Sequence, residues 1–83
     1  MKSIVVYVTK NKKVFGKIDI VAENVVSDIT GELTTKLEAV FTDLDGELHF
    51  LSTKHCIYDS EIEAARSSIN YYAEEAVRGY QQN

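Results

Sequence analysis

The last quarter of the chain repeats apolar residues with a helical period, and this feature most restricts what the residues before it can form. From Ser60 to Tyr80, apolar side chains recur every three or four positions and so lie on one face of an α-helix. The stripe consists of Ile62, Ala65, Ile69, Tyr72, Ala73, Ala76 and Tyr80. Ser60 and Glu63 have the spacing of an N-terminal capping box, and Gly79 suits a helix end. We therefore predict one long amphipathic helix that needs an apolar surface from the rest of the chain.

Residues 1–21 have the pattern of a β-hairpin. Residues 3–9 are mostly β-branched or aromatic, and residues 14–21 alternate apolar and polar side chains over part of their length. Both faces of the first run are apolar, with Ile4, Val6 and Val8 on one side and Val5 and Tyr7 on the other. This predicts a strand that is central or covered on both sides. Between the two strands, Asn11 suits a left-handed turn, and within the second strand Gly16 indicates a bulge or a close backbone approach.

Residues 36–53 predict a second hairpin, with Asp45 and Gly46 in the turn. A two-residue loop would place Phe41 opposite Phe50. It would keep one apolar set on one face, namely Leu37, Ala39, Phe41, Leu48 and Phe50. A three-residue loop with Gly46 in a bulge would place Phe41 opposite His49 and divide that set, so we favour the shorter loop. Residues 23–35 mix strand and turn signals, and they form either an edge strand followed by a loop or an irregular connection between hairpins.

Together these patterns predict a two-layer α+β fold. An antiparallel sheet of about four strands, arranged as two β-hairpins, packs against one long C-terminal helix. The 83 residues are enough for one domain, residues 1–83, with a small core. No stretch approaches the roughly 20 apolar residues that span a bilayer, and the first strand-like run is too short for a signal-peptide core. We therefore expect a cytoplasmic protein without a membrane partner, which agrees with its single cysteine, Cys56.

Charge is unevenly distributed along the chain. The formal net charge is −4, yet residues 1–17 contain five lysines and no acidic residue. A basic turn flanked by Tyr7 and Phe15 can contact a phosphate backbone, so one alternative function is nucleic-acid association through this hairpin. The binding residues would be Lys10, Lys12, Lys13 and Lys17. The acidic remainder and the absence of an RNP-type aromatic motif favour a solvated turn instead.

Few residues suggest catalysis or metal binding. One group of potential metal ligands is close in sequence: His49, His55, Cys56 and Asp59. It lacks the C-x-x-C or H-x-x-x-H spacing that zinc sites favour. Two acidic pairs, Asp43 with Asp45 and Glu61 with Glu63, are explained by a turn and by helix capping. We therefore expect no enzyme activity, no metal and no cofactor, and a small enzyme or ligand binder around Cys56 is the third alternative.

A single helix can cover only one face of the predicted sheet. The apolar residues expected on the other face are Val5, Tyr7, Phe15, Val21, Val40 and Leu51. A contiguous apolar face of this size is typical of an interface, either in a homodimer, through the sheet face or an edge strand, or with a different protein. On the outer side of the helix, Tyr71 and Arg78 have the composition of a second contact patch. The predicted partner-binding residues are Val5, Tyr7, Phe15, Val40, Leu51, Tyr71 and Arg78.

In size, acidic charge and one-domain composition, the chain is similar to small phage-encoded inhibitors of host enzymes or defence systems. This likeness covers size and composition and carries over to no individual residue. It implies a viral protein that works in the host cytoplasm as an inhibitor or regulator of a larger protein. Our leading hypothesis is accordingly a non-catalytic, acidic protein-binding module.

Overall fold

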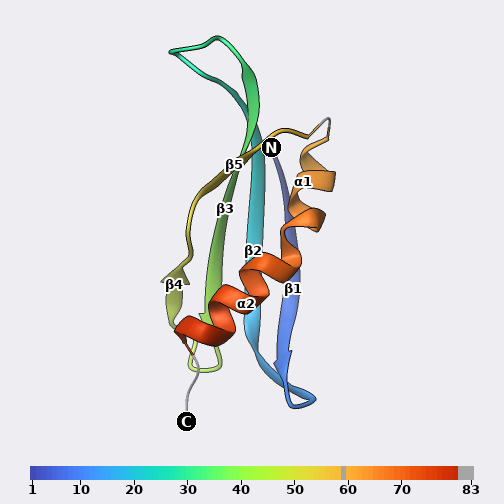
Figure 1. Ribbon diagram of the computed structural model, residues 1–83. Helices are drawn as coiled ribbons and strands as arrows, with labels where there is room; N and C mark the ends of the chain where they lie inside the picture. Colours follow the sequence, from blue (N-terminus) through green and yellow to red (C-terminus); the bar gives the residue numbers. More distant parts are fainter. Residues whose placement is uncertain (59, 81–83) are drawn as a thin grey trace.

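The computed structural model describes residues 1–58 and 60–80 (Figure 1). Its elements are β1 (Lys2–Lys10), β2 (Lys13–Val26), β3 (Leu33–Asp43), β4 (Leu48–Phe50), β5 (Lys54–Cys56), α1 (Glu61–Ser67) and α2 (Ile69–Gly79). The strands form one antiparallel sheet in the order β1-β2-β3-β4, and β5 pairs with a different part of β3. Both helices lie on the same face of the sheet (Figure 1). The predicted α+β class with an antiparallel sheet is confirmed, and none of the described helices is long and apolar enough to cross a membrane.

The first hairpin forms as predicted, with two refinements. Asn11 and Lys12 both have positive φ, 53° and 64°, as the two central residues of a type I′ turn require. Lys10 pairs with Lys13 and Thr9 pairs with Val14, but Val8 pairs with Gly16. The register thus shifts by one residue between Thr9 and Val8. This bulge is located where Gly16 indicated one. It also turns the Phe15 ring toward the helix side, so the expectation that Phe15 lies on the uncovered face is wrong.

β1 is an edge strand, because it pairs with β2 alone. The prediction of a central or doubly covered strand was therefore wrong, although one apolar side of β1 does pack into the core. Residues 23–26 form a strand, which agrees with one of the two alternatives for this segment. They pair with β3 but not with β1, because β1 ends opposite Ala22. They continue β2 directly, and the hairpin arm that they form with the start of β3 projects beyond the rest of the molecule (Figure 1).

The turn after β3 has the three-residue loop that we disfavoured. Phe41 lies opposite His49 and Val40 lies opposite Phe50, so the predicted pairing of Phe41 with Phe50 is wrong. Asp43 N–H donates to the Glu47 carbonyl at 3.0 Å, and Gly46 has a φ of 85°. The physical reason is the Asp43 carboxylate, which accepts the backbone N–H groups of two turn residues and stabilises the longer loop.

The predicted single helix is broken at Ser68 into α1 and α2. The Ser68 hydroxyl donates to the Ala65 carbonyl at 2.8 Å, and its N–H also donates there at 3.2 Å, which tightens the last turn of α1. The N-cap at Ser60 and the end at Gly79 are both confirmed. The apolar period continues through the break, so the sequence pattern did not reveal it.

The core lies between the helices and one face of β1, β2 and β3. Its buried residues are Val8, Ile18, Ile20, Ala22, Leu37, Ala39, Phe41, Ala64, Ala65, Tyr72 and Ala76. Leu51 packs against this cluster, and its N–H donates to the Ala39 carbonyl, so the prediction that it lies on the uncovered face is wrong. Within the predicted apolar stripe of the helices, Tyr72 is fully buried, whereas Ile69 is only partly buried.

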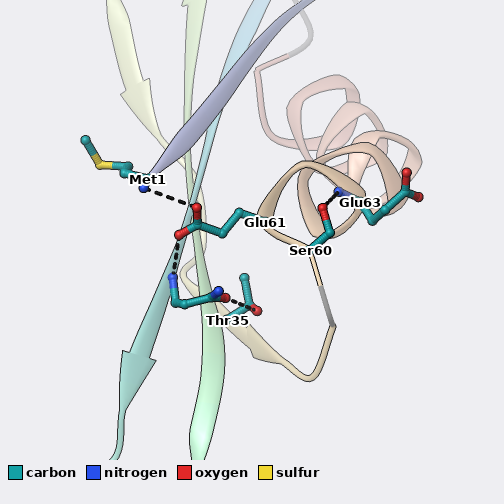
Figure 2. A network of polar contacts seen from close by, with 6 residues as sticks. Met1, Thr35, Ser60, Glu61 and Glu63 are labelled. Carbon is teal, nitrogen blue, oxygen red and sulfur yellow. Dashed lines mark hydrogen bonds and ion pairs between the residues drawn. The ribbon is translucent and has the colours of Figure 1, made fainter.

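Glu61 connects the start of α1 to the sheet (Figure 2). Its carboxylate accepts the Asn24 N–H at 2.8 Å and lies 3.2 Å from the Met1 amino group. The Asn24 side chain in turn accepts the Thr35 hydroxyl at 2.9 Å. These contacts hold the pKa of Glu61 below its usual value, the Asn24 hydrogen bond being the largest cause. Glu61 is therefore a structural residue, as the capping explanation of the pair with Glu63 implied.

Candidate functional site

The face of the sheet that the helices leave open carries a patch of apolar side chains, which we call the outer face. The strand pairings align two neighbouring rows across the sheet. One row is Val5, Asp19, Val40 and Phe50, and the other is Tyr7, Lys17, Thr42 and Leu48. Both helices, α1 and α2, lie on the opposite face of the sheet (Figure 1). The outer face is therefore open to a partner.

The large side chains of this face are strongly exposed. Phe50 is 78% exposed, Tyr7 71%, Leu48 61% and Val5 57%. Val5 and Leu48 help to line a shallow hollow of about 340 Å³, whose lining also includes the charged side chains of Lys17, Asp19 and Glu38. Apolar and aromatic side chains around a few polar groups are the usual composition of a protein–protein interface.

The structure divides the partner-binding residues predicted on the sheet between two places. Val5, Tyr7 and Val40 lie on the outer face as predicted, whereas Phe15 and Leu51 pack toward the core. Leu48 and Phe50 belong to the outer face but were assigned to the core, because the wrong hairpin register reversed the direction of every side chain in β4.

Tyr71 connects α2 to the chain that joins β4 and β5. The Lys54 ammonium lies 4.0 Å from the centre of the Tyr71 ring, and the Tyr71 hydroxyl lies 3.2 Å from the Ser52 hydroxyl. Ser52 also donates its N–H and its hydroxyl to Glu75, at 2.9 and 2.7 Å. Tyr71 is thus engaged within the chain, and Arg78 is exposed. Contacts within the chain therefore account for Tyr71, which is one of the two residues of the predicted Tyr71–Arg78 patch.

A second polar group, absent from the sequence prediction, lies at the turn after β3. Asp43, Glu47 and His49 place potential metal-ligand atoms within 4.8 Å of one another. One Asp43 oxygen accepts the N–H groups of Asp45 and Glu47, and the other lies 2.8 Å from His49 Nε2. The His49 ring stacks on Tyr80 at 4.2 Å. Both carboxylate oxygens of Asp43 are engaged within the turn, so this arrangement stabilises the turn.

Protonation of Asp43 should destabilise the protein in acid. The hydrogen bond from His49 is the largest cause that holds the pKa of Asp43 below its usual value, and the Glu47 and Asp45 N–H groups add to it. A carboxyl group with a lowered folded-state pKa stabilises the fold above its unfolded pKa of about 4, and this contribution disappears as the pH falls through the folded value. We expect urea melts to show falling stability below about pH 4.

The matched variants for this acid dependence are Asp43→Asn and Asp45→Asn. Asp43→Asn should be less stable at neutral pH and should lose less stability between pH 5 and pH 2 than the unmodified chain. Asp45 is exposed, so Asp45→Asn should keep the unmodified pH dependence. Parallel curves for Asp43→Asn and the unmodified chain would show that Asp43 does not cause the effect.

Cys56 and the histidines do not form a site. Thr35 lies opposite Cys56 and Lys36 lies opposite His55, so the two neighbouring side chains point to opposite faces of the sheet. The Cys56 thiol is partly buried and lies 3.7 Å from the Thr35 carbonyl oxygen. Among the described residues, Cys56 belongs to no group with metal-ligand spacing, and Asp59 lies outside them.

The lysines of the first hairpin are divided between two surfaces. Lys10 and Lys13 line a hollow of about 440 Å³ together with Phe15, Tyr80 and the acidic Asp43. Lys17, in contrast, lies on the outer face beside Asp19. Lys17 therefore lies on a different surface from Lys10 and Lys13, and the Asp43 carboxylate lies beside these two.

A scan against protein-family models, a search of curated proteins and a search of solved structures find no match to this chain.

Proposed function

We propose that this chain is a non-catalytic protein-binding module that covers a surface of a larger partner with the outer face of its sheet. The observation that carries the proposal is the pair of aligned rows in which Tyr7, Leu48 and Phe50 are exposed without cover from any described element. On the likeness in size and charge to phage-encoded inhibitors, we extend the proposal to an inhibitory role in a host cytoplasm.

Two aromatic residues lie at opposite edges of this face, Tyr7 on β1 and Phe50 on β4. Aromatic side chains carry much of the binding energy in known interfaces, since they bury a large area at a low cost in conformational entropy. Lys17 and Asp19 lie between the two edges and supply charges that a partner must match. The face therefore combines apolar anchors with a means of selecting one partner.

The test compares two exposed apolar residues in different places. Phe50→Glu puts a charge on the outer face, and Phe50 is 78% exposed and outside the core cluster, so the fold should persist. Ile57→Glu is the control, because Ile57 is 80% exposed and lies beyond β5. Affinity capture from host lysate should recover a protein with the unmodified chain and with Ile57→Glu. Phe50→Glu should weaken its binding by about thirtyfold or more, the loss of one interface hot spot.

Two results would contradict the proposal. Equal capture by Phe50→Glu and by the unmodified chain would show that the outer face is not the binding surface. Recovery that nuclease treatment abolishes, with binding that weakens steeply as salt rises, would show nucleic-acid association through the lysine turn.

A further inference from the structure

The free edge of β1 is a second surface that the fold leaves open. β1 has nine residues and pairs with β2 alone, so alternate residues direct backbone N–H and C=O groups away from the sheet. The far edge of β3 is different, because two strands of three residues each cover parts of it. Proteins usually protect a long edge with proline, inward-pointing charges or a bulge in the edge strand. β1 has none of these, since its charges are at its ends and the extra residue of the bulge is in β2.

The sequence of β1 is complementary to itself. If a second copy runs antiparallel beside it about a twofold axis at Val6, Val5 faces Tyr7, and Ile4 faces Val8. Each pair joins two odd-numbered or two even-numbered residues. Side chains on one face of β1 therefore meet side chains on the same face of the second copy. Pairs of aromatic with β-branched residues, and of two β-branched residues, are favourable across antiparallel strands. A second copy therefore fits this edge without placing an apolar residue on the wrong face.

Charge at the two ends of the molecule favours the same arrangement. The lysine turn at the end of β1 and the acidic hairpin arm at the start of β1 lie at opposite ends of the molecule (Figure 1). Antiparallel pairing brings the turn of each copy, with Lys10 and Lys12, beside the base of the arm of the other copy, where Glu23 and Glu61 lie. Lys2 would face Lys10, and these acidic residues offset that repulsion.

The helix layer is complementary as well. α1 packs beside the part of β1 nearest the N-terminus (Figure 1), whereas a groove of about 550 Å³ lies beside Tyr7, Val8 and Thr9. α2 supplies the other wall of this groove, with Ile69, Ala73 and Val77 as its apolar part. A twofold axis through the middle of β1 places α1 of each copy next to the groove of the other. The groove of each copy would thus be covered by α1 of the other copy.

We propose that two copies of this chain pair antiparallel through β1 and form one continuous sheet with both helix layers on the same side. This proposal is independent of the proposed function, because it uses the edge and not the outer face. It has one consequence for that function: the two outer faces would lie side by side and present a surface of doubled length.

Two measurements on the unmodified chain test the pairing. Sedimentation over a wide range of concentrations should show a monomer–dimer equilibrium that salt weakens, since exposed charges contribute to it. Hydrogen exchange should show alternate amides of β1 exchanging at least about tenfold more slowly at the dimer concentration, because they become hydrogen-bonded between copies. A monomer at every concentration would overturn the proposal, and so would a dimer in which these amides stay unprotected.

A charge swap then tests the register. Lys12→Glu and Glu23→Lys should each weaken the dimer by about tenfold, since two symmetric contacts change from attraction to repulsion. The double variant should regain most of the affinity. Lys12 and Glu23 are separated by about 30 Å along β2 in one chain, well beyond the screening length of about 10 Å at 0.1 M salt, so only contact between copies can restore it.

Phe50→Glu separates this proposal from the outer-face proposal. It should leave the dimer unchanged, because Phe50 lies on β4, three strands from the β1 edge. Loss of the dimer in Phe50→Glu would show that the copies associate through their outer faces. Additive weakening in the double charge variant would overturn the proposed register.

Discussion

Tyr72→Ala should cost about 3–5 kcal/mol of unfolding free energy, the usual loss when a large buried aromatic side chain is removed from a core. Tyr72 is 0% exposed and lies at the centre of the contact between α2 and the sheet. Its hydroxyl donates to the Ser52 carbonyl at 2.8 Å and lies 3.3 Å from the Leu37 carbonyl oxygen. One side chain therefore joins the helix, β3 and the β4–β5 connection. Since a domain of this size has a stability of only several kcal/mol, the variant should be largely unfolded at 25 °C.

Two further variants separate the packing of Tyr72 from its hydrogen bonding. Tyr72→Phe keeps the ring and leaves the Ser52 carbonyl without its donor, so it should cost about 1–2 kcal/mol. Burial raises the pKa of Tyr72 far above its usual value, which keeps the hydroxyl protonated and able to donate. Tyr71→Ala is the positional control and should cost less than about 1 kcal/mol, because Tyr71 is half exposed and its contacts are at the surface.

Urea denaturation of these three variants and of the unmodified chain measures the differences directly. If Tyr71→Ala and Tyr72→Ala lost equal stability, α2 would be rotated relative to the sheet. If Tyr72→Phe lost as much as Tyr72→Ala, the hydroxyl and not the ring would be the main source of stability.

Gly16→Ala is the second substitution with a large expected effect, a loss of about 2–3 kcal/mol. A Cβ atom at this position would lie 2.5 Å from Cε1 of Phe41 and 2.5 Å from the Thr42 carbonyl oxygen. The Phe41 ring is fully buried and stacks on Phe15, so it has little room to move. The carbonyl belongs to β3, which pairs with β2 along its whole length, and moving it would disturb the ladder.

Gly79→Ala is the matched control for this substitution. A Cβ atom at Gly79 would meet nothing within 4 Å, and Gly79 is the last residue of α2. Its replacement should change the unfolding free energy by less than about 1 kcal/mol, with stabilisation expected from the lower entropy of the unfolded chain. Thermal and urea melts of both variants give the comparison. Equal stability of the Gly16 and Gly79 variants would mean that the bulge at Gly16 relaxes without cost.

The errors for Leu48, Phe50 and Leu51 in the sequence prediction of the site come from a single residue of register. The Asp45–Gly46 turn was identified correctly, but the same residues are compatible with either a two-residue or a three-residue loop. In the structure, Asp43 selects the longer loop by binding two turn N–H groups, and its other oxygen contacts His49, whose ring stacks on Tyr80. Tyr80 is thirty-one positions after His49, so no local pattern contains this contact. The shift moved Leu48 and Phe50 from the predicted core to the outer face.

The sequence alone determined the features that depend on neighbours within a few positions. These include the strands of the first hairpin, the left-handed Asn11, the Ser60 N-cap, the end of α2 at Gly79 and the alternation that buries Ile18 and Ile20. Their free energies come from backbone conformation and local hydrogen bonds, which short patterns report. Only the tertiary structure decided the edge position of β1 and the inward direction of Phe15, which stacks on Phe41. Both depend on contacts between residues far apart in the chain, where packing selects among conformations that local preferences leave nearly equal in free energy. The helix break at Ser68 is local, since Ser68 bonds to the Ala65 carbonyl, but the apolar period does not report it.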